Sequence, residues 1–174
     1  MTVKQKILSG ITYLDGAMGT MLQARGLRAG ELPEMWNLDH PDVVTDIHLE
    51  YLDAGSDIIL ANTFGANFLK YGVGDTPDVS EVVAAAIENA RRAVNKCGRE
   101  AFVALDIGPS GRMLEPLGDY GFEDAVAMFA RTVRAGSAAG ADLIFIETND
   151  ITNDVNKVEL KNYNDDEDED EQDI

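Results

Sequence analysis

The sequence has few of the residues that cross-link a chain or cage a metal. Its 174 residues include a single cysteine, Cys97, and two histidines. One cysteine excludes an intrachain disulfide and any metal site built only from cysteines of one chain. His40 and His48 stand eight positions apart with no carboxylate and cysteine set beside them. We therefore predict no metal site, and packing or structural roles for His48 and Cys97.

Long apolar stretches are also missing. No run of about 18 apolar residues occurs, so we expect no transmembrane helix and no membrane partner. The apolar stretch within residues 1–10 is too short for a secretory signal. The apolar fraction of 45% is nevertheless enough for one domain with its own core. These features predict a cytoplasmic protein.

Positive charge is scarce. The chain has 14 Lys and Arg against 32 Asp and Glu, and its net charge is −18. Eight of the acids lie in residues 165–173, and the remainder of the chain is still negative without them. Such a surface repels a phosphate backbone, which disfavours nucleic-acid binding, and we expect no nucleic-acid partner. We predict a domain over residues 1–148 and a disordered Asn/Asp/Glu-rich tail over 149–174, with an interaction tail or a weak divalent-cation site as the alternative.

Strand-like and helix-like segments alternate along the domain. Apolar runs predict strands at 11–15, 57–62, 101–106 and 142–147, and helical periodicity predicts helices at 41–54, 80–96 and 122–139. The last three strands are continuously apolar, which is typical of a parallel sheet buried on both faces. The repeat length is close to one unit of a (β/α)₈ barrel, which needs about 250 residues when complete. We predict an α/β fold: the N-terminal half of a (β/α)₈ TIM barrel, with four parallel strands and their helices.

Local signals refine the three helices. Asp39 and Ser80 are the predicted N-terminal caps of the first two, and Gly55 and Gly98 follow them as stops. The apolar residues at helical spacing predict one buried face on each later helix: Val83, Ile87, Ala90 and Val94 on the second, and Phe122, Val126, Phe129 and Val133 on the third.

Every predicted strand ends in a polar residue followed by a small or turn residue. These residues are Asp15 before Gly16, then Asn62 and Thr63, then Asp106, then Glu147 and Thr148. The carboxyl ends of parallel strands meet at one edge of a sheet, so these side chains can share a pocket. Carboxylates accept from an ammonium group while amides donate to a carboxylate, which suits a zwitterionic ligand. The alternative is that the polar residues only cap the helices that follow.

Glycine-rich turns add to this prediction. Gly16 and Gly19 frame the turn after the first strand and let main chain approach a ligand closely. Their spacing matches neither a dinucleotide-binding fingerprint nor a Walker loop. The segment 108–112, GPSGR, is either an anion-binding loop or a plain turn. Trp36 is interpreted as a packing lid near the pocket mouth.

Four segments taken in series resemble the homocysteine S-methyltransferase family. They are LDGAMGTMLQ, WNLDHPDVVTDIHLEYLDAGSDIILANTFGAN, DIGPSGRMLEPLGD and DLIFIET. The resemblance covers about residues 5–148 and is strongest to the N-terminal homocysteine-binding domain of cobalamin-dependent methionine synthases. It implies a (β/α)₈ barrel that binds homocysteine at its C-terminal face.

The resemblance also implies roles for particular residues. Acids matching Asp15 and Glu147 hold the amino group of homocysteine, main chain near Gly16 assists, and Asn62 and Thr63 line the same pocket. In the family, zinc binds the substrate thiol as a thiolate, which then attacks a methyl group carried by cobalamin or another donor.

The zinc ligands are where this sequence departs from the family. The family's three zinc cysteines follow strands six and eight, and no residue here matches them. We therefore expect a truncated, homocysteine-binding portion that is inactive alone. The alternative is a non-catalytic assembly module that pairs with itself or with a second half-barrel chain, because the strands at 11–15 and 142–147 would be open edges. The tail would then keep such a chain soluble.

Overall fold

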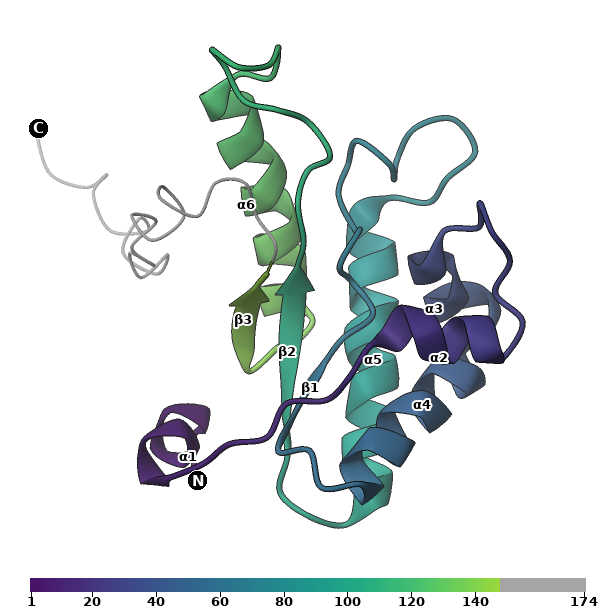
Figure 1. The fold of residues 1–174 in the computed structure, drawn as a ribbon, viewed down its shortest axis with the longest axis vertical. Helices are drawn as coiled ribbons and strands as arrows, with labels where there is room; N and C mark the ends of the chain where they lie inside the picture. The colour runs from purple at the N-terminus through teal and green to yellow at the C-terminus, as the bar shows by residue number, and fades with distance from the viewer. Residues whose placement is uncertain (148–174) are drawn as a thin grey trace, which may run out of the picture.

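The computed structural model describes residues 1–147, so the predicted acidic tail lies outside the described residues. Helices and strands alternate along the chain as expected for an α/β protein (Figure 1). In chain order they are α1 (Val3–Ser9), α2 (Met18–Ala24), the 3₁₀ helix η1 (Pro33–Met35), α3 (Trp36–Asp39), α4 (Pro41–Asp53), β1 (Ile58–Leu60), α5 (Val79–Cys97), β2 (Phe102–Ile107), α6 (Phe122–Ala138) and β3 (Leu143–Ile146).

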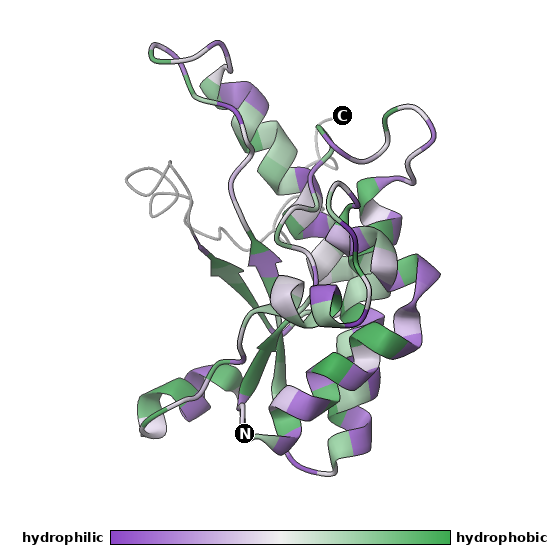
Figure 2. Ribbon diagram, turned by 45° about the vertical axis from the view of Figure 1, so that its right-hand side comes forward, coloured by the Kyte–Doolittle hydropathy of each residue, from purple (hydrophilic) through white to green (hydrophobic). Residues whose placement is uncertain are grey.

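The sheet is parallel, as the sequence predicts. Its strand order is β1-β2-β3, with Leu60 beside Ala104 and Ala104 beside Leu143. Helix α5 connects β1 to β2, α6 connects β2 to β3, and α5 packs against both α4 and α6. Figure 2 shows the strands as apolar along most of their length. No helix of residues 1–147 is both long and apolar enough to cross a bilayer.

The first predicted strand, 11–15, is wrong as a strand and forms only one parallel bridge, between Leu14 and Ile58. The main-chain N–H of Asp15 donates to Ile58 O over 3.1 Å. The next donor along β1, the N–H of Leu60, is taken by the Asp15 carboxylate at 3.0 Å. Because a side chain replaces the main-chain acceptor, the pairing ends there. The described sheet therefore has three strands instead of the predicted four, with the segment around Leu14 beside β1.

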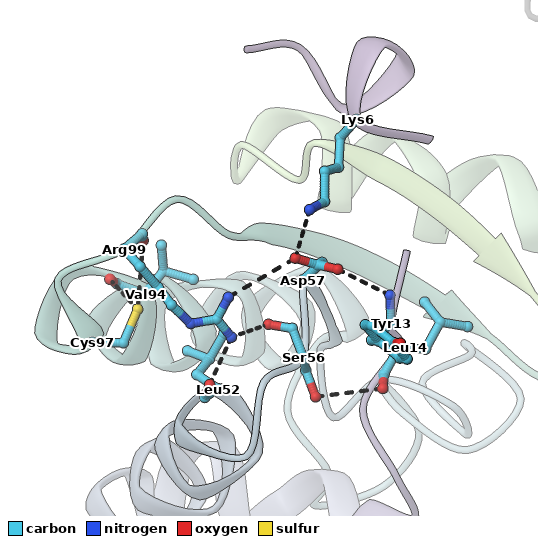
Figure 3. A network of polar contacts seen from close by, with 9 residues as sticks. All are labelled: Lys6, Tyr13, Leu14, Leu52, Ser56, Asp57, Val94, Cys97 and Arg99. Carbon is cyan, nitrogen blue, oxygen red and sulfur yellow. Dashed lines mark hydrogen bonds and ion pairs between the residues drawn. The ribbon is translucent and has the colours of Figure 1, made fainter. Parts of the chain in front are cut away.

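A polar network holds this segment against the start of β1 (Figure 3). Asp57 accepts a hydrogen bond from Tyr13 N at 3.0 Å and pairs with Lys6 Nζ at 2.8 Å and more loosely with Arg99 at 3.9 Å. The hydrogen bond from Lys6 is the main reason why the pKa of Asp57 lies below its usual value. By fixing Tyr13, the network also sets where Asp15 emerges at the other end of the segment.

The helix bounds follow the sequence closely, but two predicted caps are wrong. Asp78, instead of Ser80, caps α5: its carboxylate accepts from the Ser80 N–H at 2.9 Å. Asp39 belongs to α3, and α4 starts at Pro41 without a side-chain cap, since proline needs no N–H partner in the first turn. Gly98 ends α5 with φ of 71°, as predicted.

The main core lies between the sheet and α5. Ile59, Val103 and Leu105 from the strands are buried together with Val83, Ile87 and Ala90 of α5, as the helical spacing predicts. Val94 packs at the margin of this core.

Helix α6 turns a different face inward from the one predicted. Phe122 and Val126 are 47% and 38% exposed, while Ala125, Met128 and Thr132 are buried. A glycine on α6 explains why this other face packs against the sheet. A Cβ at Gly136 would stand only 2.6 Å from Leu105 Cδ2. The helix therefore approaches the sheet through Gly136, and Phe129 and Val133 pack at the side.

The two outer edges of the sheet are less covered than its middle. Strand β3 is only partly buried and Ile146 is 44% exposed, so the predicted burial of this strand on both faces is wrong. Within residues 1–147, β3 has a strand neighbour on one side only. Apolar side chains are also exposed on α1 and on the segment that follows it, namely Ile7, Leu8, Ile11, Tyr13 and Leu14.

Candidate functional site

Three carboxylates, those of Asp15, Asp106 and Glu147, lie at the C-terminal edge of the sheet within the range of one another's charge. Asp106 lies near the end of β2, and Glu147 directly follows β3, where its N–H donates to Ile107 O at 3.1 Å. Asp106 pairs in register with Phe145, so Glu147, two residues further on, is on the same face of the sheet. Glu147 and Asp15 are both near enough for their charges to act on Asp106.

Desolvation makes two of these acids, Asp106 and Asp15, hard to ionise. Asp106 is 6% exposed, and its Oδ1 has no hydrogen-bond partner, as is also true of Asp15 Oδ1. Desolvation, followed by the charges of Glu147 and Asp15, raises the pKa of Asp106 to about 7. Desolvation likewise raises the pKa of Asp15 to about 7, although the N–H of Leu60 opposes the shift.

The cluster has no cation of its own. Among the residues that the structure describes, no ion pair includes Asp15, Asp106 or Glu147. A buried group of acids with spare acceptor atoms is a complementary environment for an ammonium group.

The predicted polar neighbours Asn62 and Thr63 lie at the same edge but are engaged by the protein. The Thr63 hydroxyl donates to Asp106 O at 2.8 Å and accepts from Asp106 N at 3.0 Å, which ties β1 to β2 beside the cluster. The Asn62 amide donates to Pro33 O at 2.8 Å and to Asn37 Oδ1 at 3.2 Å. Their roles toward a ligand stay predictions.

Gly16 is required by a neighbouring ring. A Cβ at this position would lie 2.9 Å from Cε1 of Tyr51, whose hydroxyl donates to Ala17 O at 3.2 Å. Tyr51 on α4 therefore buttresses the turn that follows Asp15. Main chain at Gly16 remains exposed, as the predicted approach to a ligand requires.

The contacts of segment 108–112 favour the turn interpretation over an anion-binding loop. Gly108 N donates to Phe64 O at 3.1 Å, and a Cβ on Gly108 would stand 2.6 Å from that oxygen. The Ser110 hydroxyl accepts from Arg112 N at 3.0 Å, and the Arg112 guanidinium pairs with Asp119 at 2.8 Å. The loop is thus closed by its own bonds.

Two acids of this region have no role in the predicted ligand set. Asp106 is among the predicted strand-end residues of the pocket, but the resemblance gives only Asp15 and Glu147 a role toward the amino group. Glu34 of η1 had no such signal: it is 4% exposed and accepts from Gly65 N at 2.6 Å and from the Tyr71 hydroxyl at 2.8 Å. Its charge also acts on Asp106.

Trp36 is a packing residue, but it lies away from the carboxylates. It is 8% exposed and its ring stands 4.4 Å from that of His40. Both line a groove along α2, η1 and α3 that includes Arg25 and Arg28 and none of the three carboxylates.

The described residues do not fit a zinc site. Within residues 1–147, no three His, Cys, Asp or Glu side chains are grouped so that they could hold a metal ion. Cys97 ends α5 near Arg99 and Asp57, at the opposite edge of the sheet from Asp106, and its Sγ donates to Val94 O at 3.1 Å (Figure 3). His48 is fully buried in α4 while His40 is exposed, so the two do not form a pair of ligands.

Comparisons with known sequences match this chain to one family and to methionine synthases. The homocysteine S-methyltransferase family matches residues 12–165. Methionine synthase of Mycobacterium tuberculosis (strain ATCC 25618 / H37Rv) is 31% identical over 156 residues, which are 84% of this chain and 13% of that protein. Methionine synthase of Mycobacterium leprae (strain TN) is 29% identical over 157 residues, with the same shares of each chain. The chain thus spans about an eighth of the length of these relatives.

Solved structures agree with the sequence matches. The metallated form of the homocysteine methyltransferase MmuM from Escherichia coli superposes with a TM-score of 0.70 at 25% identity, over 83% of this chain and 56% of that one. Its oxidized form gives a TM-score of 0.62 at 27% identity, over 77% and 51%. With the family match covering most of its length, the chain belongs to the homocysteine S-methyltransferase family.

Proposed function

We propose that this chain is the homocysteine-binding portion of a homocysteine S-methyltransferase of the methionine synthase kind. The observation that supports this most directly is the group of carboxylates at the C-terminal edge of the sheet, which has no cation of its own among the described residues. An amino-acid ligand supplies the missing positive charge through its ammonium group. Because the chain belongs to the homocysteine S-methyltransferase family, we propose homocysteine as this amino-acid ligand.

In this proposal Asp15 and Glu147 accept the N–H groups of the homocysteine ammonium. Main chain at Gly16 donates to the ligand's carboxylate, with Asn62 and Thr63 lining the pocket. The Asp15 side chain is already oriented by the N–H of Leu60, which leaves its second oxygen for the ligand. A preoriented acceptor loses little side-chain entropy on binding.

We further propose that the chain alone transfers no methyl group. Transfer needs the homocysteine thiol as a thiolate, the form that acts as a nucleophile. The single cysteine of the sequence lies at the wrong edge of the sheet to help hold a zinc ion near the carboxylates. Zinc ligands and a methyl donor such as cobalamin would come from outside residues 1–147.

The test of homocysteine binding is a titration of purified full-length protein by calorimetry. We expect Glu147→Gln and Asp15→Asn each to weaken binding at least about tenfold, because each removes a charged acceptor from the ammonium group. Glu115→Gln, an exposed acid on the loop before α6, is the matched control and should bind like the wild type. Equal affinities for wild type and Glu147→Gln would remove Glu147 from the site.

A second ligand separates recognition of the amine from recognition of the thiol. 4-Mercaptobutanoate has the carbon chain, thiol and carboxylate of homocysteine without the amine. If the acids bind the ammonium group, this compound should bind wild type and Glu147→Gln equally weakly. Tight binding to the wild type would contradict the proposed role of the acids.

The exposed apolar side chains near the N-terminus favour a second candidate function, an assembly module. Ile7 and Leu8 of α1, and Ile11 and Tyr13 of the segment that follows it, expose between 48% and 78% of their surface. An uncovered apolar surface of this kind is a candidate pairing site for another chain, either a second copy or a complementary half-barrel.

The mass of the protein in solution tests the assembly candidate. If the apolar surface near the N-terminus pairs two copies, the wild-type protein should be a dimer in light scattering. The double variant Leu8→Lys with Ile11→Lys should be a monomer. Leu117→Lys is the control, because Leu117 is 83% exposed on the loop before α6. A monomeric wild type that unfolds cooperatively would contradict pairing between copies.

A further inference from the structure

We propose that Asp106 is a third acid of the amine site, which holds a proton while the site is empty and releases it when the ammonium group binds. The inference rests on the proposed homocysteine-binding function. It adds Asp106 to the residues of the site and a released proton to the binding reaction. It makes binding of the amine a proton-releasing step.

The position of Asp106 is fixed by the fold. Its main-chain N–H and C=O both bond to the Thr63 hydroxyl, at 3.0 and 2.8 Å. Register with Phe145 places its side chain on the face of the sheet that Glu147 shares. The residue is 6% exposed, and Oδ1 has no partner although it is buried. A buried acceptor without a partner is costly unless a ligand supplies the donor.

The charged groups that face Asp106 are all acidic. Glu147 approaches from the end of β3, Asp15 from the segment before α2, and Glu34 from η1. Glu34 already accepts one hydrogen bond on each oxygen, from Gly65 N and from the Tyr71 hydroxyl. Asp15 and Asp106 are therefore costly to ionise together beside the charge of Glu147.

A retained proton resolves this repulsion in the empty site. The raised pKa of both Asp15 and Asp106, to about 7, is consistent with on the order of one proton held by the cluster at neutral pH. The buried Asp106 Oδ1, which has no hydrogen-bond partner, likewise disfavours the ionised form of this acid in the empty site.

Binding then exchanges a proton for an ammonium group. The carboxyl O–H bond breaks, the proton passes to solvent, and the N–H groups of the ligand take its place as donors to the ionised acids. No other bond forms or breaks. Because the unliganded site holds more protons than the liganded one, affinity rises as pH increases through about 7. It levels off once the empty site is fully ionised.

Calorimetry of the full chain with homocysteine measures the released proton directly. Titrations at one pH in two buffers of different ionisation enthalpy give the number of protons released per ligand bound. We expect about one for wild type near pH 6.5 and clearly fewer for Asp106→Asn, in which Asp15 is the remaining acid with a raised pKa. Between pH 6 and pH 8 wild-type affinity should rise about tenfold, and that of Asp106→Asn by a smaller factor.

The control is Asp119→Asn, an exposed acid paired with Arg112, which should release the same number of protons as wild type. Carboxyl ¹³C signals of wild type give a second measurement that needs no variant. The Asp106 signal should titrate near pH 7 in the free protein and stay ionised at that pH with homocysteine bound.

The outcomes separate this inference from the proposed function. Binding by wild type without proton release, or equal release by Asp106→Asn, would overturn the role of Asp106 while leaving homocysteine binding in place. No binding of homocysteine at any pH would overturn the proposed function together with this inference. An Asp106 signal that titrates near pH 4 in the free protein would overturn the retained proton.

Discussion

Replacing Asn62 by alanine is expected to lower the free energy of unfolding by about 3 kcal/mol. Asn62 is 5% exposed and sits at the centre of a buried amide network. Its side chain donates to Pro33 O and Asn37 Oδ1, its main-chain O accepts from Asn37 Nδ2 at 2.8 Å, and Asn89 Nδ2 donates to Asn37 O at 3.0 Å. The alanine would leave the buried Asn37 Oδ1 without this donor, remove one of the donors to Pro33 O, and open a cavity beside them.

Denaturant unfolding monitored by circular dichroism measures this loss. Asn95→Ala on the exposed face of α5 is the control, and we expect it to change stability by less than about 0.5 kcal/mol. The result also decides between two roles for Asn62. If Asn62→Ala keeps full stability but binds homocysteine weakly, the residue is a ligand contact, and the network that ties β1 to η1 and α3 is unimportant for folding.

The second large effect is a pH dependence that His48 imposes on stability. His48 is fully buried in α4 and neither ring nitrogen has a hydrogen-bond partner. Desolvation lowers its pKa from 6.5 to about 4. Because the folded pKa is below the unfolded one, the unfolded chain binds more protons between these values, and stability falls as pH decreases from about 6.5 toward 4.

The size of this effect follows from the shift. At pH 5, His48 should cost the folded state about 2 kcal/mol relative to pH 7.5. Asp15 and Asp106 act in the opposite direction, because their pKa in the folded chain is raised to about 7. They bind protons more readily when folded, so their contribution to stability is lost as pH rises toward and through 7.

A matched pair of variants isolates the histidine from the two acids. His48→Gln should remove the ionisable ring, so its stability relative to wild type should be about 2 kcal/mol more favourable at pH 5 than at pH 7.5. His40→Gln, at an exposed position, tests whether loss of any histidine gives the same change. Parallel pH profiles for wild type and His48→Gln, measured by denaturant unfolding, would show that His48 is not buried as a neutral ring.

Much of the fold could be predicted because its signals are local. Val83, Ile87 and Ala90 repeat at helical spacing, and the run from Phe102 to Ile107 is long and apolar enough to identify a buried parallel strand. Gly98 ends α5 because a residue without a Cβ takes a positive φ at no steric cost. The four segments that resemble the family are likewise short stretches of neighbouring residues, so the resemblance could be found without the tertiary structure.

The errors arose where distant residues compete for the same group or the same space. The predicted strand at 11–15 forms only one bridge, because the Leu60 N–H donates to the Asp15 carboxylate instead of to a main-chain oxygen. Helix α6 turned because Gly136 meets Leu105, a contact that helical spacing cannot anticipate.

The sequence by itself determined which acids stand at strand ends, because strand periodicity and polar ends are properties of neighbouring residues. Only the tertiary structure decided which of them meet. Asp106 and Glu147 share a face through the register of β2 with β3, and Asp15 joins them through the position that Tyr13 and Asp57 give its segment. Their raised pKa values follow from that convergence, since desolvation and mutual repulsion depend on what surrounds a carboxyl group in space.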